Sequence, residues 1–265
     1  MSEMTLAYSK GLNAGGVLPT AKHFPGHGGT SQDSHQTTPR KMSSLEELQK
    51  RDFVPFEKFT EVIFPRAIMM AHLSLPKIDA SGVPATYSST IIKNQLRDVI
   101  GYDGLVITDD LEMSGAAIKG DIGERAIKAF LAGNDMLMLA GSPRNQRKAF
   151  LDMVKAVHSG RIPLSRLNES VTRILEAKSQ YSLEPVKLDE KKVLTAFKKI
   201  NTLSLEVLKR NFKVASAVAH RGWPEVTGST RVTVFSASGL FHQNSRRRLR
   251  DARSSIISRR TRLTG

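Results

Sequence analysis

Short, continuously apolar runs alternate with longer amphipathic stretches along the first 180 residues of the chain. A short apolar run bounded by turn residues is typical of a strand that is buried on both faces of a parallel sheet. The repeated order of strand, loop and helix indicates βα units and an α/β fold. The predicted strands are 17–21, 67–71, 104–108 and 135–139.

The amphipathic stretches between these runs predict the helices. Ser44 is a suitable N-cap for a helix that starts at Leu45, and three phenylalanines at a spacing of three residues predict a buried stripe on its continuation. Two glycines after Ala14 favour the end of a first helix there. The predicted helices are 1–16, a segment from 44 through Phe53, Phe56 and Phe59, and 90–100, 121–132, 143–158 and 164–179.

The repeat stops after residue 181. We expect three parts: residues 1–181 as the repeating domain, 182–240 as a linker and the start of a second α/β segment, and 241–265 as a tail. Within the second part, 190–219 reads as basic helix and 231–235 as a possible strand. The tail has no apolar periodicity and is predicted to be disordered.

Composition excludes several classes of protein. The 265 residues include no cysteine, so disulfides and thiolate metal sites are impossible. No apolar run approaches the roughly 20 residues that span a bilayer. No signal peptide is visible at Met1, which favours a cytoplasmic location unless an export signal precedes this sequence. The net charge is +15, of which residues 242–265 carry +7 through eight arginines and one aspartate.

Candidate chemistry gathers directly after the first predicted strand. Residues 21–35 contain three histidines, one lysine and one aspartate, and Pro25 with its neighbouring glycines predicts a loop there. Loops at the carboxyl ends of strands carry the active sites of βα folds. Asp33 and His35 share one side of an extended segment, where the carboxylate would orient the imidazole and raise its pKa.

Polar residues also end the next two predicted strands, at His72 and at Asp109–Asp110. In a barrel these positions face the same mouth as Lys22 and His23. Adjacent residues at a strand end point to opposite sides, so one of the two aspartates faces the mouth. An acid/base group opposite a carboxylate nucleophile is the arrangement that retaining glycoside hydrolysis needs, and a histidine paired with an aspartate is suited to the acid/base part.

Two long motifs carry a family resemblance over about residues 1–180. The segment Lys-His-Phe-Pro-Gly-His-Gly at 22–28, followed by Thr30 and Asp-Ser-His at 33–35, resembles the signature of bacterial β-N-acetylglucosaminidases of glycoside hydrolase family 3. The segment from Gly101 to Met113 resembles that family's nucleophile motif, and residues 132–137 also fit.

The resemblance implies a fold and a set of roles. The fold would be the second half of a (β/α)8 TIM-type barrel, because four βα units cannot close eight strands. The enzyme would be a β-N-acetylhexosaminidase without metal or cofactor, and its substrate an amino-sugar glycoside derived from peptidoglycan. The implied site comprises Asp109 as nucleophile, His35 as acid/base, Asp33 as its partner, and Lys22 and His23 as sugar-binding residues.

Three alternatives remain open on the sequence alone. The chain could be an inactive fragment of such an enzyme. It could be a metal-dependent hydrolase that uses His23, His27, Asp33 and His35 as ligands, although this spacing matches no compact metal motif. Finally, the arginine-rich tail could bind nucleic acid, although it lacks the interleaved aromatic residues that stack on bases. No nucleic-acid partner is therefore expected.

Overall fold

The computed structural model describes residues 2–30, 32–34, 36–181 and 189–218. The chain divides into two compact units, Met1–Pro185 and Val186–Gly265. The start of the predicted linker, residues 182–188, lies outside the described residues, as do the possible strand at 231–235 and the arginine-rich tail at 241–265. The second unit is represented by helix α7, Glu190–Val218, which agrees with the predicted basic helix.

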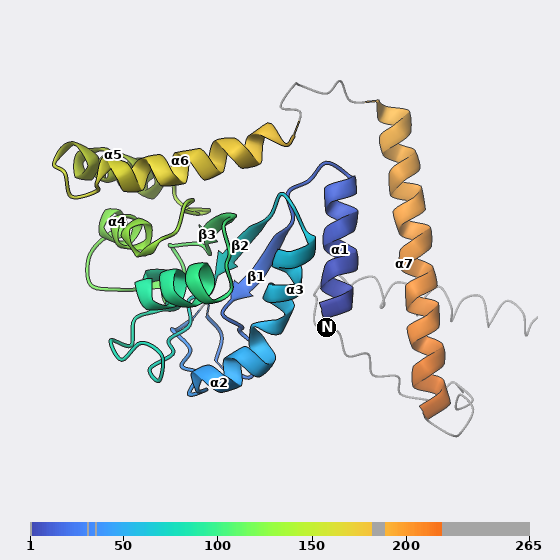
Figure 1. Cartoon of the computed structure of the whole chain (residues 1–265). Helices are drawn as coiled ribbons and strands as arrows, with labels where there is room; N and C mark the ends of the chain where they lie inside the picture. The colour runs from blue at the N-terminus through green and yellow to red at the C-terminus, as the bar shows by residue number, and fades with distance from the viewer. Residues whose placement is uncertain (1, 31, 35, 182–188, 219–265) are drawn as a thin grey trace, which may run out of the picture. The chain divides into compact units, whose positions relative to one another are not determined.

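The first unit contains a parallel three-stranded sheet in the order β1-β2-β3 (Figure 1). Its strands are β1 Thr20–Phe24, β2 Ala67–Met70 and β3 Leu105–Thr108. Thr20 pairs with Ala67, which in turn pairs with Leu105, so all three strands start level and end level. The predicted α/β class and the parallel pairing are confirmed.

Strand β1 lies further along the chain than predicted. It runs from Thr20 to Phe24 rather than over 17–21, so Lys22 and His23 belong to the strand and not to the loop. Val17 is 52% exposed, whereas Phe24 is fully buried and its ring lies 5.1 Å from that of Phe53. Burial of Phe24 therefore extends the strand, and Pro25 ends it because its nitrogen has no hydrogen to donate.

The predicted fourth strand at 135–139 is not formed. Met136 makes a single parallel bridge with Ile107, and its carbonyl accepts from the Thr108 amide at 3.1 Å. The Met136 amide also donates to the Val106 carbonyl at 3.1 Å, and two side chains add further bonds: the Asp135 carboxylate accepts from the Val106 amide at 3.0 Å, and the Thr108 hydroxyl accepts from the Met138 amide at 2.9 Å. The segment lies along β3 without continuing the sheet.

The helices of the first unit follow the predicted pattern closely. Ser44 forms a capping box with Glu47, and Asp121 and Ser142 cap two later helices through their side chains. The segments predicted from Ser44 and over 90–100 contain π-helical stretches. The elements are α1 Ser2–Ala14, α2 Leu45–Glu47, a π-helical turn Leu48–Asp52, α3 Val54–Val62, a 3-10 turn Ala85–Tyr87, a π-helix Thr90–Val99, a 3-10 turn Ser114–Ala116, α4 Ile122–Ala132, α5 Pro143–His158 and α6 Leu164–Ser179.

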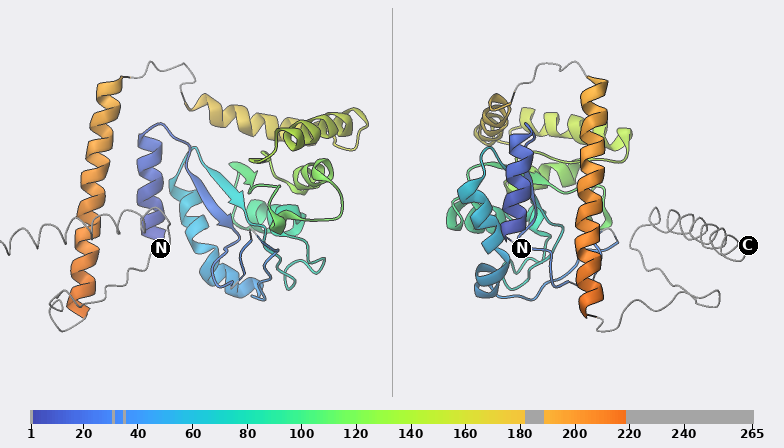
Figure 2. Two further views of the ribbon diagram at one scale, coloured as in Figure 1. Left: turned by 180° about the vertical axis from the view of Figure 1, so that it is seen from behind. Right: turned by 90° about the vertical axis from the view of Figure 1, so that its right-hand side faces the viewer.

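The core of the first unit lies between the sheet and its helices. The predicted phenylalanine stripe is confirmed: Phe53, Phe56 and Phe59 are all buried, and the first two pack on Phe24 of β1. Helices α1 and α3 pack together beyond β1, and α4 and α5 pack together on the side of β3 (Figures 1 and 2).

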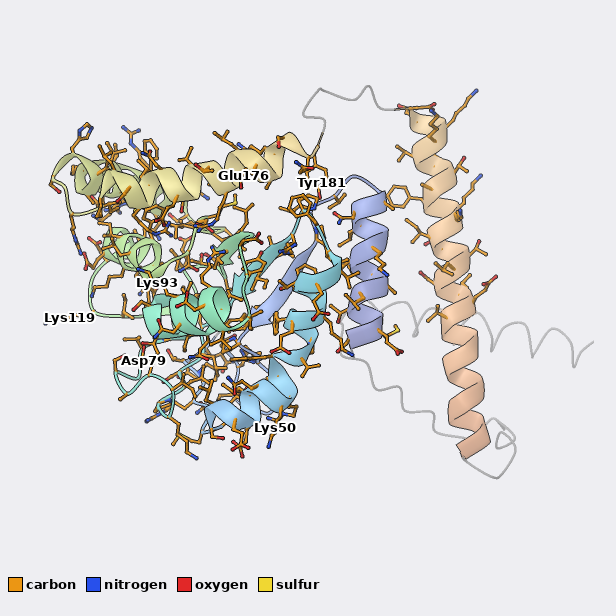
Figure 3. The ribbon with its side chains drawn as sticks, in the orientation of Figure 1. Lys50, Asp79, Lys93, Lys119, Glu176 and Tyr181 are labelled. Atoms are coloured by element: carbon orange, nitrogen blue, oxygen red, sulfur yellow. The ribbon has the colours of Figure 1, made fainter. Side chains whose placement is uncertain are left out.

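One hydrogen bond joins the two ends of this unit. Tyr181 follows α6 (Figure 3), and its hydroxyl donates to the Asn13 side chain of α1 at 2.9 Å. Within the described residues no helix has the length and apolar character needed to span a membrane.

Candidate active site

The carboxyl ends of the three strands bring three chemical groups to one edge of the sheet. They are His23 on β1, His72 two residues after the end of β2, and Asp109 directly after β3. His23 Nε2 lies 3.3 Å from Asp109 Oδ2, although 86 residues separate them. The parallel register brings the carboxyl ends of β1 and β3 to the same edge of the sheet, and a register shift between Lys22 and Phe24 leaves His23 outside the regular pairing with β2.

Asp109 is held as a carboxylate. Its Oδ2 faces His23, and its Oδ1 accepts from the Asp110 amide at 2.9 Å. The hydrogen bond from His23 lowers the pKa of Asp109 to about 2, and the Asp110 amide acts in the same direction against partial burial. Because of this low pKa, the carboxyl group is ionised at neutral pH. Its side chain is 16% exposed and can be reached from solvent.

Asp110 has a different role from its neighbour. Its Oδ1 accepts from the amides of Glu112 and Ala140, at 3.0 and 3.2 Å. The adjacent aspartates therefore point to different partners, as the alternation at a strand end predicts. Of the two carboxylates, Asp109 is the one directed at the histidine from β1.

Glu112 extends this support and was not singled out from the sequence. Its carboxylate accepts from the amides of Gly141 and Ser142 and from the Asn145 side chain, at distances of 2.6 to 3.1 Å. These bonds tie the segment after Asp109 to the start of α5. The sequence signal for this role is only that a carboxylate stands two residues after Asp110. It does not show that Glu112 binds the segment 141–145.

His72 supports the main chain of the same segment. The ring is almost fully buried, with Nε2 3.0 Å from the Asp110 carbonyl and Nδ1 2.8 Å from the Thr86 hydroxyl. Burial lowers the pKa of His72, which favours the neutral ring. Because a carbonyl only accepts, Nε2 carries the hydrogen and donates it to Asp110. Neutral His72 thus holds the backbone beside Asp109.

Lys22 and His27 flank His23 along the chain. Lys22 is exposed on β1. The His27 ring lies edge-on to the His23 ring, with centroids 5.9 Å apart, and its Nδ1 lies 3.3 Å from the Thr30 hydroxyl. His27 thus contacts the loop's own Thr30 and the neighbouring His23.

The predicted dyad is described only in part. Asp33 is exposed, and its carbonyl accepts from the amides of Gln36 and Thr37 in a tight turn. His35 lies outside the described residues, so its predicted pairing with Asp33 stays a prediction.

The loop that carries Asp33 docks on the chain that follows Asp109. The Ser34 carbonyl accepts from the Gly115 amide at 3.0 Å, and the Thr38 hydroxyl donates to the Gly115 carbonyl at 2.8 Å. A Cβ at Gly115 would lie 2.4 Å from the Ser34 oxygen, so no larger residue fits there without movement. The loop is thereby fixed next to the nucleophile segment.

Two further observations concern ligands. Over the part of the chain that is described, no group of three histidine, aspartate or glutamate side chains is arranged to hold a metal ion. A cavity of about 990 Å³ lies between the loop after β2 and α4, with Thr38, Ser74, Tyr87 and Lys128 among its lining residues. Neither His23 nor Asp109 lines it, so the strand-end groups, rather than this cavity, define the candidate site.

Comparison with known proteins matches residues 1–177 to the family described as the glycosyl hydrolase family 3 N-terminal domain. A β-hexosaminidase of Methylococcus capsulatus is 39% identical over 137 residues, covering 52% of this chain and 40% of that protein. A β-hexosaminidase of Idiomarina loihiensis is 32% identical over 187 residues, covering 71% of this chain and 54% of that protein. The chain thus spans about half the length of the curated relatives it matches.

A solved structure agrees with these sequence matches. The glycoside hydrolase family 3 β-N-acetylglucosaminidase from Paenibacillus sp. strain FPU-7 superposes with a TM-score of 0.67 at 34% identity. The match covers 71% of this chain and 36% of that chain. The similarity is therefore one of sequence and of three-dimensional arrangement across the first unit.

Proposed function

Because the chain belongs to glycoside hydrolase family 3, we propose that it carries the nucleophile of a retaining β-N-acetylglucosaminidase, which removes terminal β-linked N-acetylglucosamine. The observation that carries this proposal is the contact of His23 Nε2 with Asp109 Oδ2 at 3.3 Å. An ionised carboxylate, reachable from solvent and oriented by a histidine of β1, is the group that such a reaction needs at the anomeric carbon.

The proposed reaction has two steps. In the first, an Asp109 oxygen bonds to the anomeric carbon while the bond to the leaving oxygen breaks, and His35 gives that oxygen its proton. In the second, His35 takes a proton from water, the water oxygen bonds to the anomeric carbon, and Asp109 leaves as a carboxylate. Asp33 orients His35 and tunes its pKa.

We propose that Lys22 and His23 bind the sugar hydroxyls. Lys22 is exposed on β1 and His23 is 25% exposed at its side chain. His23 Nε2 faces Asp109, which leaves Nδ1 for a hydroxyl of the same sugar whose anomeric carbon Asp109 attacks. An amino-sugar glycoside derived from peptidoglycan is the substrate class that this assignment favours.

We further propose that the first unit is the second half of a (β/α)8 barrel. The three parallel strands, and the segment that lies along β3 from Asp135 to Met138, have the order of successive barrel units. The chemical groups at their carboxyl ends then face one barrel mouth.

The test is release of chromophore from an aryl N-acetyl-β-glucosaminide by the full chain and by Asp109→Asn. We expect turnover that falls at least about a thousandfold in the variant, since removal of a single triad-type nucleophile has effects of that size or larger. Asp103→Asn is the matched control: this aspartate is 78% exposed, pairs with Arg66, and should leave turnover unchanged.

Either of two results would contradict the proposal. Turnover that persists in Asp109→Asn would mean that another group is the nucleophile. Absence of turnover from a chain whose circular dichroism shows the folded α/β unit would mean that this polypeptide is an inactive part of such an enzyme.

A further inference from the structure

A buried ion pair contacts the turn at Gly26, which follows His23. The Lys41 ammonium is 2.6 Å from Asp52 Oδ1, and the two side chains are only 4% and 8% exposed. Arg51 contacts the other Asp52 oxygen at 3.1 Å. A buried pair of this kind seldom adds net stability over an apolar pair, because both ions lose their hydration. Net stability therefore does not explain why the Lys41–Asp52 pair is buried at this place.

The same ammonium makes a second contact, with the main chain of the candidate site. Lys41 Nζ donates to the Gly26 carbonyl at 2.9 Å. The main chain of Lys41 is itself fixed, because its amide donates to the Ser74 carbonyl at 2.9 Å. Lys41 thus joins the turn after β1 to the segment after β2 and to Asp52.

The turn at Gly26 packs directly on this pair. The Gly26 amide donates to the His23 carbonyl at 2.8 Å, which closes the turn on His23. Gly26 has a φ of +122°, and a Cβ built there would lie 2.7 Å from Asp52 Cβ. A residue with a side chain would be strained in that conformation and would also collide with Asp52.

We propose that Lys41 and Asp52 are positioning residues that hold the Gly26 turn and thereby keep His23 against Asp109. The path runs from the ammonium to the Gly26 carbonyl, through the turn closed on His23, to the contact with Asp109. Neither Lys41 nor Asp52 contacts the Asp109 carboxylate directly. The effect of Lys41 and Asp52 on turnover rests on the proposed function, whereas their effect on the contact between His23 and Asp109 does not.

The first measurement is the pKa of the Asp109 carboxyl by carbon-13 NMR of the full chain. In Lys41→Met the turn loses its ammonium, so His23 should move from Asp109 and the Asp109 pKa should rise from about 2 toward its ordinary value of 3.8. The matched control is Lys50→Met. Lys50 is 74% exposed, pairs with Glu46, and lies on the π-helical turn that also carries Asp52 (Figure 3).

The second measurement is the kinetics of aryl glycoside hydrolysis. Because a displacement of about 1 Å can slow an enzyme by about a hundredfold, we expect kcat to fall about tenfold to a hundredfold in Lys41→Met, with a smaller change in KM. Lys50→Met should keep the kcat of the unaltered chain. A loss of general structural integrity alone would lower the active fraction without moving the Asp109 pKa.

Asp52→Asn is a second variant that keeps the shape of the side chain and the Lys41 ammonium. Asp52→Asn should also raise the Asp109 pKa, by a smaller amount than Lys41→Met. If Lys41→Met does not fold, the Asp109 pKa in Asp52→Asn tests the proposal instead. An Asp109 pKa unchanged in folded Lys41→Met, or in Asp52→Asn where Lys41→Met does not fold, would overturn the proposal. If the unaltered chain has no turnover, the proposed function fails, yet the pKa measurement still decides the role of Lys41.

Discussion

At the scale of single residues, the two adjacent aspartates show how environment assigns different roles to one side-chain type. Asp109 is bound by a histidine from β1, whereas the Asp110 carboxylate accepts from the main-chain amides of Glu112 and Ala140. The low pKa of Asp109 also links the site to stability. Because this pKa is lower in the folded chain than the ordinary 3.8, the stabilising contribution is complete above about pH 4 and is lost as the pH falls through about 2.

This linkage predicts a pH-dependent difference between the unaltered chain and Asp109→Asn. A pKa near 2 instead of 3.8 corresponds to about 2 kcal/mol. Relative to the variant, the unaltered chain should therefore lose about 2 kcal/mol of unfolding free energy between pH 5 and pH 2. Urea titrations of both proteins at several pH values measure it. A difference that stays constant over this range would mean that His23 does not hold the Asp109 carboxylate.

At the scale of elements, buried charge replaces strand pairing behind β3. The Asp135 carboxylate has no exposed surface, and it contacts Arg97 and Arg173 at 2.8 and 3.1 Å and the Ser170 hydroxyl at 2.7 Å. Arg166, from α6, lies 3.6 Å away. Burial lowers the pKa of both Arg97 and Arg166, and the charge of Asp135 opposes this effect. One carboxylate thus joins the helix before β3 to α6.

We expect Asp135→Asn to destabilise the first unit by about 3 kcal/mol, because it leaves partly buried guanidinium groups without their counter-charge. The measurement is the urea midpoint at pH 7. Asp103→Asn breaks an ion pair on the surface and should cost less than about 1 kcal/mol. If the two variants lost equal stability, the cluster around Asp135 would be no more important than a surface pair.

Sequence reasoning found the elements whose signals are local, and missed those set by distant partners. The phenylalanine stripe, the Ser44 cap and the meeting of strand-end groups follow from spacing and strand polarity. The run at 135–139 has the composition of a strand, but it makes a single bridge to β3, and the side chains of Asp135 and Thr108 supply further bonds on either side of that bridge.

The contacts that hold the candidate site in place could not be predicted from the sequence either. A lysine is normally exposed, so burial of Lys41 could not be predicted without knowing that Asp52 and the Gly26 carbonyl meet it. The hydrogen bond between His72 and Thr86 depends in the same way on a fold-back of the loop after β2.

At the scale of the whole molecule, the two compact units predict that the first can be produced alone. Residues 1–181 contain the sheet, the cores around it and the hydrogen bond from Tyr181 to Asn13 that joins the ends of the unit. We expect a chain of residues 1–181 to keep the backbone amide chemical shifts of β1, β2 and β3 found in the full chain. Nitrogen-15 correlation spectra of both chains provide the comparison. Shifts displaced throughout the sheet, or a collapsed spectrum, would mean that the remaining residues are needed for folding.

The strand order also has a consequence for the chain as it is synthesised. In the described structure the only neighbour of β1 is β2, and β2 starts at Ala67, some 43 residues after Phe24. At about 5 to 20 residues per second, the ribosome takes roughly 2 to 9 seconds to add that stretch. Throughout this interval the nascent β1 lacks its sheet partner. The histidine-bearing strand is therefore accessible to chaperones before its sheet partner exists, and Thr20 and Lys22, which are exposed in the folded unit, give it polar side chains during that time.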